Sequence, residues 1–204
     1  EAANAAVIEA ALNGLGKPGM GCTATCAYIE NDTLAIAHVG DSRAYLLHEG
    51  TLIRVTRDHS YVEELVDAGE ITADEARVHP NRSVITRALG SDPAMYADHF
   101  TLHIEEGDRL ILCSDGLSSM IPDSDIENIA TQSSTAQICV DNLVDAALAA
   151  GGHDNVTVVV VDLVDDGIMR EAQRVRRRNI TIGVVLGLVL VLAAGIWAYT
   201  GVTG

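Results

Sequence analysis

Short apolar segments rich in β-branched residues, separated by hairpin-type turns, constrain the fold of this chain more than any other feature. Asn31-Asp32, Glu49-Gly50 and Glu106-Gly107-Asp108 are typical turn sequences, and each lies between two strand-like segments. Hairpins of this kind join neighbouring strands in antiparallel order, so we expect antiparallel sheet. The predicted strands are residues 22–29, 33–39, 44–48, 51–55, 99–104, 109–114 and 155–163.

Helical segments precede, interrupt and follow these strands. Residues 1–12 are Ala-rich, residues 61–68 and 72–77 form two short segments separated by Gly69, and residues 135–150 carry apolar positions at largely helical spacing. Aromatic residues make up only 3% of the chain, so Val, Ile, Leu and Ala must fill the core. Antiparallel strands with helices before and after them predict an α+β layered sandwich.

Three aspartates, Asp41, Asp115 and Asp154, each occupy a turn that bounds a predicted strand. A single aspartate at such a place most often accepts hydrogen bonds from nearby backbone N–H groups. Three of them at strand ends can instead converge on a hard divalent cation such as Mg²⁺, Mn²⁺ or Ca²⁺, which prefers oxygen ligands. A site of this kind indicates metal-assisted hydrolysis.

These aspartates belong to a series of motifs in a consistent order. The series is Gly19-Met20-Gly21-Cys22-Thr23-Ala24-Thr25, Asp41-Ser42-Arg43-Ala44-Tyr45, Asp58-His59-Ser60, Ile85-Thr86-Arg87-Ala88-Leu89-Gly90, Ser114-Asp115-Gly116-Leu117 and Asp154-Asn155-Val156-Thr157. Over about residues 10–163 the chain closely resembles the bacterial form of the metal-dependent type 2C Ser/Thr protein phosphatases. The resemblance implies an α-β-β-α sandwich of two mainly antiparallel sheets. It also implies hydrolysis of phosphoserine and phosphothreonine in phosphoproteins, opposing a cognate Ser/Thr kinase.

The resemblance also implies roles for particular residues. Asp115 and Asp154 match the downstream ligands of two core Mn²⁺ or Mg²⁺ ions, and Gly116 lets the backbone approach an ion closely because it has no Cβ. Asp41 matches a carboxylate that helps to hold a third, more loosely bound ion. No catalytic group beyond these metal ligands is assigned.

Three further residues are weaker candidates. Asn155 is placed to orient Asp154 as an outer-shell donor, and Ser83 and Arg87 are candidates for contact with substrate or metal. Ser83 and Arg87 lie in residues 58–90, which match a flap beside the catalytic centre in the resembled family. The alternative is a helical hairpin that only packs against the domain.

Charge is distributed unevenly along the chain. Residues 1–169 contain 28 acidic and 8 basic residues, a net charge of −20. Nucleic-acid binding by this part of the chain is excluded, because phosphate groups would be repelled by it. The Cys residues lack zinc-finger spacing, and no Cys-x5-Arg loop of a Cys-dependent phosphatase is present.

The C-terminal residues read as a membrane anchor. Residues 180–200 carry no charge and are almost wholly apolar, which is long enough for one transmembrane helix. The preceding linker, residues 165–179, is Arg-rich, and the positive-inside tendency therefore places the phosphatase-like domain in the cytoplasm. Residues 201–204 would then form a short extracytoplasmic tail.

One departure from the family keeps a second function open. The family's upstream motifs, an acidic strand, a phosphate-gripping Arg and an Asp-Gly pair, have no counterpart in this sequence. We therefore expect residues 1–164 to be a partial type 2C phosphatase domain, truncated at its N-terminal side and possessing reduced or no activity by itself. The alternative function is a catalytically dead pseudophosphatase or a membrane-tethered phosphoprotein-binding module.

Overall fold

The computed structural model describes residues 1–164. The predicted Arg-rich linker, transmembrane helix and tail, residues 165–204, lie outside the described residues. Among the described residues, no helix has the length and apolar character needed to cross a bilayer.

A three-stranded antiparallel sheet is formed by β1 (Ala24–Glu30), β2 (Thr33–Val39) and β5 (Asp98–His103), in the order β1-β2-β5. Strands β1 and β2 form the predicted hairpin through Asn31, whose φ of 54° lies in the left-handed region that Asn tolerates better than most residues. Strand β2 is central and alternates apolar residues toward the interior, with Leu34 and Ile36 fully buried.

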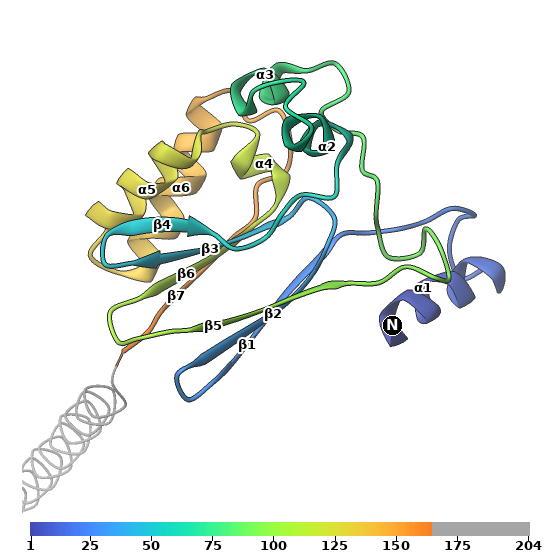
Figure 1. Cartoon of the computed structure of the whole chain (residues 1–204), viewed down its shortest axis with the longest axis horizontal. Coiled ribbons are helices and arrows are strands. Elements are labelled where there is room, and N and C mark those ends of the chain that lie inside the picture. The colour runs from blue at the N-terminus through green and yellow to red at the C-terminus, as the bar shows by residue number, and fades with distance from the viewer. Residues whose placement is uncertain (165–204) are drawn as a thin grey trace, which may run out of the picture. The chain divides into compact units, whose positions relative to one another are not determined.

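The second sheet has four antiparallel strands in the order β4-β3-β6-β7 (Figure 1). They are β3 (Arg43–His48), β4 (Thr51–Arg54), β6 (Arg109–Cys113) and β7 (Val158–Asp162). The β3–β4 hairpin turns through Glu49 and Gly50, which both have positive φ, as a tight two-residue hairpin requires.

Alternation along β3 and β6 builds one core on each face of the four-stranded sheet. Ala44, Leu46 and Leu110 point toward the three-stranded sheet and pack with Leu34 and Ile36. The residues between them point to the opposite face, where they pack with helical side chains. That second core contains Tyr45, Ile111, Cys113, Leu117, Ile121, Ile126, Ala130, Cys139, Leu143 and Ala147.

Six helices complete the described residues: α1 (Ala2–Leu12), α2 (Tyr61–Asp67), α3 (Ala73–Val78), α4 (Asp115–Ser118), α5 (Asp123–Gln132) and α6 (Ala136–Ala149). Helices α5 and α6 cover the outer face of the four-stranded sheet (Figure 1). Helices α2 and α3 form a separate pair above the ends of the strands. Ser60, Thr72 and Thr135 cap α2, α3 and α6 with side-chain oxygens, which explains where these helices begin.

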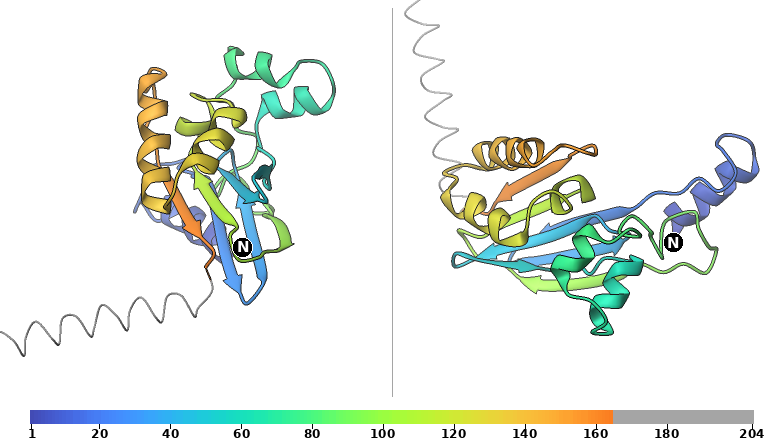
Figure 2. Two further views of the ribbon diagram at one scale, coloured as in Figure 1. Left: turned by 90° about the vertical axis from the view of Figure 1, so that its left-hand side faces the viewer. Right: turned by 90° about the horizontal axis from the view of Figure 1, so that it is seen from above.

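The α+β class and the two antiparallel sheets are confirmed, but the helical layers differ from the expected sandwich. Helix α1 lies beyond one end of the three-stranded sheet, and no described helix covers its outer face (Figures 1 and 2). The three-stranded sheet also leaves part of the facing side of strand β7 uncovered. Val159 and Val161 share a face with the partly buried Leu112 and the buried Leu110, yet they are 48% and 38% exposed.

Candidate functional site

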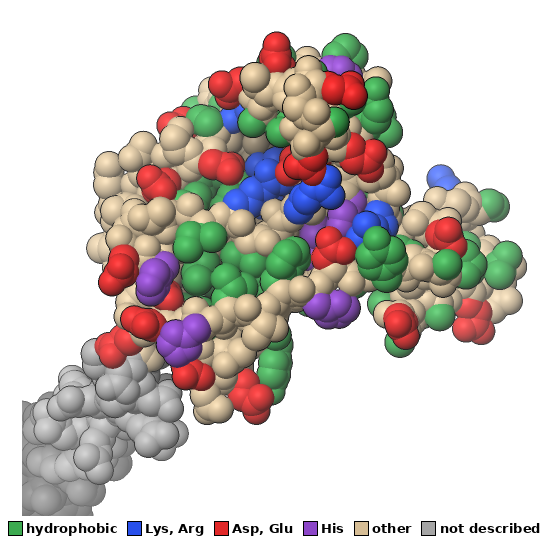
Figure 3. Space-filling view, viewed as in Figure 1, with side chains coloured by type: hydrophobic (Ala, Val, Ile, Leu, Met, Phe, Trp, Pro, Cys, Tyr) green, Lys and Arg blue, Asp and Glu red, His purple; other side chains and the backbone are tan. Residues whose placement is uncertain are grey.

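A cavity of about 480 Å³ lies where the strand ends of the two-sheet body meet helices α2 and α3. All three predicted metal-site aspartates, Asp41, Asp115 and Asp154, line it. Its walls also include Arg43, Arg54, Asp58, Ser60, Glu63, Asp74, Arg77, Arg82, Ser83, Asp123 and His153. In the space-filling view, basic side chains gather beneath the α2–α3 pair with acidic side chains around them (Figure 3).

Strand register explains why the aspartates meet. Cys113, the last residue of β6, pairs with Arg43 at the start of β3 and with Val158 at the start of β7. Asp41 lies two residues before Arg43, and Asp115 lies two residues after Cys113. Because antiparallel neighbours begin and end at the same edge of a sheet, these turns converge there.

The Asp154 loop is held against the start of α4 by the Ser114 hydroxyl, which hydrogen-bonds to backbone groups of the loop. Ser114 Oγ donates to the Asn155 carbonyl at 3.2 Å and accepts from the Thr157 N–H at 3.0 Å. A Cβ on Gly116 would lie 2.3 Å from the Asn155 carbonyl oxygen, so only glycine permits this approach. Gly116 therefore brings the loop carrying Asp154 beside Asp115, and its predicted contact with an ion remains a prediction.

The electrostatics of the cavity favour a cation. Burial raises the pKa of Asp41 to about 6, and the nearby carboxylates of Asp115 and Asp58 add to the shift. The pKa of Asp115 is also raised, first by burial and then by Asp154. Carboxylates that resist ionisation in each other's presence become favourable once a positive ion lies between them.

The donor set fits a hard divalent ion that keeps part of its water shell. Among residues 1–164, no three His, Cys, Asp or Glu side chains are close enough to hold one ion together. Mg²⁺ commonly binds through one or two carboxylates and retains several waters, which matches the carboxylates present here. Asp115 with Asp154, and Asp41 beside Asp115, are the pairs that the structure brings together.

The weaker sequence candidates fall in different places. Asn155 contacts Asp154 through its backbone N–H, which donates to Asp154 Oδ1 at 2.7 Å, and not through its side chain. Ser83 lines the cavity. Arg87 does not line it, because its guanidinium pairs with Asp98 at 2.7 Å and lies over the Tyr96 ring.

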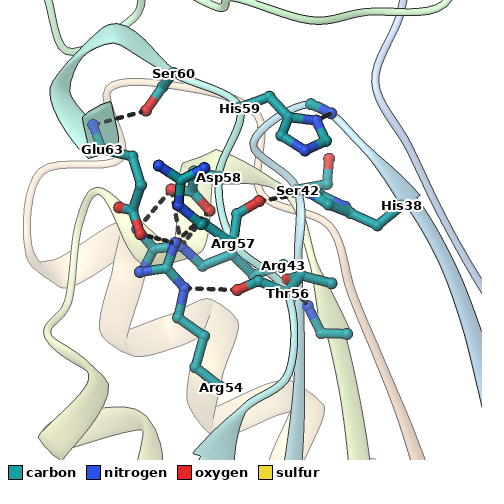
Figure 4. A network of polar contacts seen from close by, with 12 residues as sticks. His38, Ser42, Arg43, Arg54, Thr56, Arg57, Asp58, His59, Ser60 and Glu63 are labelled. Atoms are coloured by element: carbon teal, nitrogen blue, oxygen red, sulfur yellow. Dashed lines mark hydrogen bonds and ion pairs between the residues drawn. The ribbon is translucent and has the colours of Figure 1, made fainter. Parts of the chain in front are cut away.

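Sequence reasoning missed the ion-pair network on the cavity wall. Asp58 is only 7% exposed and accepts hydrogen bonds from Arg43 Nε and Nη2, the latter at 2.8 Å (Figure 4). Burial opposes the charge of Arg43, but the hydrogen bonds to Asp58 outweigh it and raise the pKa of Arg43. Arg43 therefore holds the buried Asp58 in the cavity wall. The one available signal was the Arg within a strand whose other inward residues are apolar.

Arg54 extends this network to helix α2. Its Nη2 atom lies 2.8 Å from Asp58 Oδ1 and 3.1 Å from Glu63 Oε1 (Figure 4). These are ion pairs without hydrogen-bond geometry, since Nη2 has no hydrogen-bond partner. They connect the first helix of the flap-like segment to the four-stranded sheet.

Comparison with known proteins gives a consistent result. The family model described as "Protein phosphatase 2C" matches residues 10–156. The serine/threonine phosphatase stp of Listeria welshimeri is 40% identical over 144 residues, which cover 71% of this chain and 57% of that protein. The serine/threonine protein phosphatase PstP of Mycobacterium tuberculosis is 45% identical over 150 residues, covering 72% of this chain and 28% of that protein.

Solved structures agree with these sequence relatives. The crystal structure of the M. tuberculosis phosphatase PstP/Ppp superposes with a TM-score of 0.74 at 40% identity, covering 79% of this chain and 68% of that one. A PstP catalytic domain in complex with two manganese ions gives a TM-score of 0.72 at 38% identity, covering 79% and 67%. The chain thus spans 57% of the length of the Listeria relative and about two thirds of these crystallised chains.

Proposed function

Because the chain belongs to the protein phosphatase 2C family, we propose that it acts as a divalent-metal-dependent phosphatase on phosphoserine and phosphothreonine in proteins. The observation that carries this proposal is the convergence of Asp41, Asp115 and Asp154 on one cavity, with the pKa values of Asp41 and Asp115 raised by burial and by neighbouring carboxylates. A cavity with this charge pattern repels a phosphate group unless cations are bound, so metal dependence follows from the residues themselves.

The chain's residues would divide the work as follows. Asp115 and Asp154 hold the core ions, and Asp41 contributes to a third, more loosely held ion. When bound, divalent ions at these carboxylates supply an activated water and neutralise phosphoryl oxygens. The Asn155 N–H donates to one oxygen of Asp154, and the other oxygen would bind the ion. Ser83, which lines the same cavity, is assigned to contact with the bound phosphopeptide.

The proposal is tested by Mn²⁺-dependent release of phosphate from phosphothreonine peptides. Asp115→Asn and Asp154→Asn each remove a charged ligand and are expected to lower the rate at least a hundredfold. Asp74→Asn is the matched control, because Asp74 lines the same cavity from the exposed side of α3 and lies in no aspartate pair. Full activity in either ligand variant would refute the assignment.

A wild-type protein that binds phosphopeptides without releasing phosphate would instead support the alternative, a phosphoprotein-binding module. The lack of a three-ligand cluster among residues 1–164 is the observation that favours this alternative. The same peptide assay, combined with a binding measurement by fluorescence anisotropy, separates the two functions.

We also propose that the protein is held at the cell membrane by residues 180–200, with the phosphatase domain in the cytoplasm, where it opposes a Ser/Thr kinase. The support is the uncharged apolar sequence of this segment and the arginines before it. Expressed in cells, the protein is expected in the membrane fraction and resistant to extraction by alkaline carbonate. Deletion of residues 180–200 is expected to move it to the supernatant, and an unchanged distribution would contradict the anchor.

A further inference from the structure

His59 is a buried side chain, 2% exposed, that joins three separate segments close to the Asp41 turn. Its Nδ1 atom accepts a hydrogen bond from the Gly40 N–H at 3.1 Å. Its backbone N–H donates to the Gly40 carbonyl at 2.7 Å, and its own carbonyl accepts from the Thr86 N–H at 2.8 Å. His59 therefore holds the residue that immediately precedes Asp41.

The conformation of Gly40 makes this support necessary. Gly40 has a φ of 108°, in the region that favours glycine, and a Cβ there would lie 2.3 Å from Thr23 Cγ2. A glycine without side-chain packing has the largest conformational freedom to lose, so the turn needs external contacts to stay in one conformation. The two hydrogen bonds to His59 are contacts of this kind.

The protonation of His59 follows from its partners. A backbone N–H can only donate, so Nδ1 carries no proton and Nε2 does. Nε2 lies 3.0 Å from Asp98 Oδ2, while Arg87 Nη1 donates to Asp98 Oδ1 at 2.7 Å. Arg87 Nη1 is also 3.0 Å from Nε2, and because both atoms carry protons, Asp98 is the acceptor for both. Asp98 thus fixes the tautomer and the orientation of the ring.

A second histidine, His38, lies beside the His59 ring. The His38 ring lies 4.9 Å from the His59 ring, centroid to centroid, and is itself fixed by Nε2 donating to the Arg57 carbonyl at 3.0 Å. With Asp98 and Arg87 at Nε2 and the tilted His38 ring beside it, the His59 ring has little freedom to move.

We propose that His59 is a positioning residue that sets the Asp41 carboxylate in the cavity through the Gly40 N–H, and thereby sets the affinity of Asp41 for a divalent ion. This proposal rests on the proposed function, which supplies the metal site. The affinity for the ion can nevertheless be measured without catalysis. Arg87, which the sequence placed in contact with substrate or metal, acts one step further away, through Asp98 and His59.

Two substitutions of His59, by Asn and by Gln, separate the roles of its two ring nitrogens. Asn places a carbonyl oxygen near the position of Nδ1 and can still accept from the Gly40 N–H. Gln places its amide near the position of Nε2, so it can still reach Asp98 but leaves the Gly40 N–H without an acceptor. Mn²⁺ binding, measured by titration calorimetry and by the EPR signal of free Mn²⁺, is the readout, with the melting temperature recorded for each variant.

We expect His59→Gln to weaken the binding of the most weakly held Mn²⁺ about tenfold, as loss of an outer-shell partner commonly does. His59→Asn should bind this ion several times more tightly than His59→Gln. In an Asp41→Asn background, His59→Gln should cause no further loss, because the effect of His59 passes through Asp41. Asp98→Asn keeps the shape of the side chain and removes its charge. It should also weaken Mn²⁺ binding, but less than His59→Gln does.

Equal Mn²⁺ affinity in His59→Asn and His59→Gln would overturn the inference, as would a loss that persists unchanged in the Asp41→Asn background. If His59→Gln does not fold, unchanged Mn²⁺ affinity in a folded Asp98→Asn variant overturns it equally. A wild-type protein without phosphatase activity would refute the proposed function and leave the Mn²⁺ comparison standing, so the two failures are distinguishable.

Discussion

At the scale of single residues, the cavity is lined by carboxyl groups whose charged form is unfavourable in the metal-free protein. Asp41 and Asp115 are partly buried carboxyl groups whose pKa values are raised first by burial, and then by the neighbouring Asp115 in the case of Asp41 and by Asp154 in the case of Asp115. Nearby Asp58 is instead paired with Arg43 and with Arg54, each at 2.8 Å. Arg43 and Arg54 are thus engaged with Asp58, and the charge of Asp41, Asp115 and Asp154 remains for a ligand to satisfy.

The raised pKa of Asp41 predicts that the stability of the metal-free protein depends on pH. Asp41 titrates near 6 in the folded protein and near its usual 3.8 in the unfolded chain. Between about pH 4 and 6 the folded protein therefore keeps a proton that the unfolded chain has released, so this group lowers stability as the pH rises through that window. Asp41→Asn should stabilise the metal-free protein above pH 6, by about 1–3 kcal/mol.

Urea unfolding in EDTA at pH 4.5 and pH 7.5 checks this prediction, with Asp74→Asn as the matched variant. The gain from Asp41→Asn should be present at pH 7.5 and small at pH 4.5. A gain of equal size at both pH values would mean that the carboxyl of Asp41 is not the cause.

At the scale of elements, the contact between α2 and the four-stranded sheet depends on a few charges. Arg54 of β4 lies between Asp58 and Glu63, and Glu63 belongs to α2. Helix α2 is short and buries few apolar side chains, with Val62 as its buried residue. Its docking should therefore respond to the loss of a single ion pair.

Glu63→Gln is expected to loosen α2 without unfolding the domain. The partly buried pair is worth about 1 kcal/mol, which corresponds to about fivefold faster local opening. Hydrogen exchange of the amides in residues 61–67 measures this opening rate. Glu64→Gln is the control, because Glu64 is an exposed residue of the same helix. Equal exchange in both variants would show that Arg54 does not anchor the helix.

The elements also show how far the sequence predicts the fold. Residues 33–39 were predicted as a strand and are β2 in full, because alternation and a turn at each end act locally. Helix α4 was not foreseen, since its four residues are held by packing of Gly116 against Asn155 rather than by helical periodicity. The pairing of Arg43 with Asp58 was missed for the same reason, because it is a tertiary contact.

At the scale of the whole molecule, two antiparallel sheets bring three turns from distant parts of the sequence to one edge. The three aspartates could be predicted from their place at strand ends, and the structure does gather them at one cavity. The environment of each could not be predicted, because burial and neighbouring charges depend on register and on packing of the sheets. Their role as metal ligands therefore stays a prediction.

The most direct test of that role is an anomalous difference map from crystals soaked in MnCl₂ and measured at the manganese edge. We predict a peak between Asp115 and Asp154, about 2.0–2.6 Å from an oxygen of each, the range expected for hard divalent ions. A fully soaked crystal with no peak at these carboxylates, or with manganese bound only elsewhere on the protein, would contradict the account.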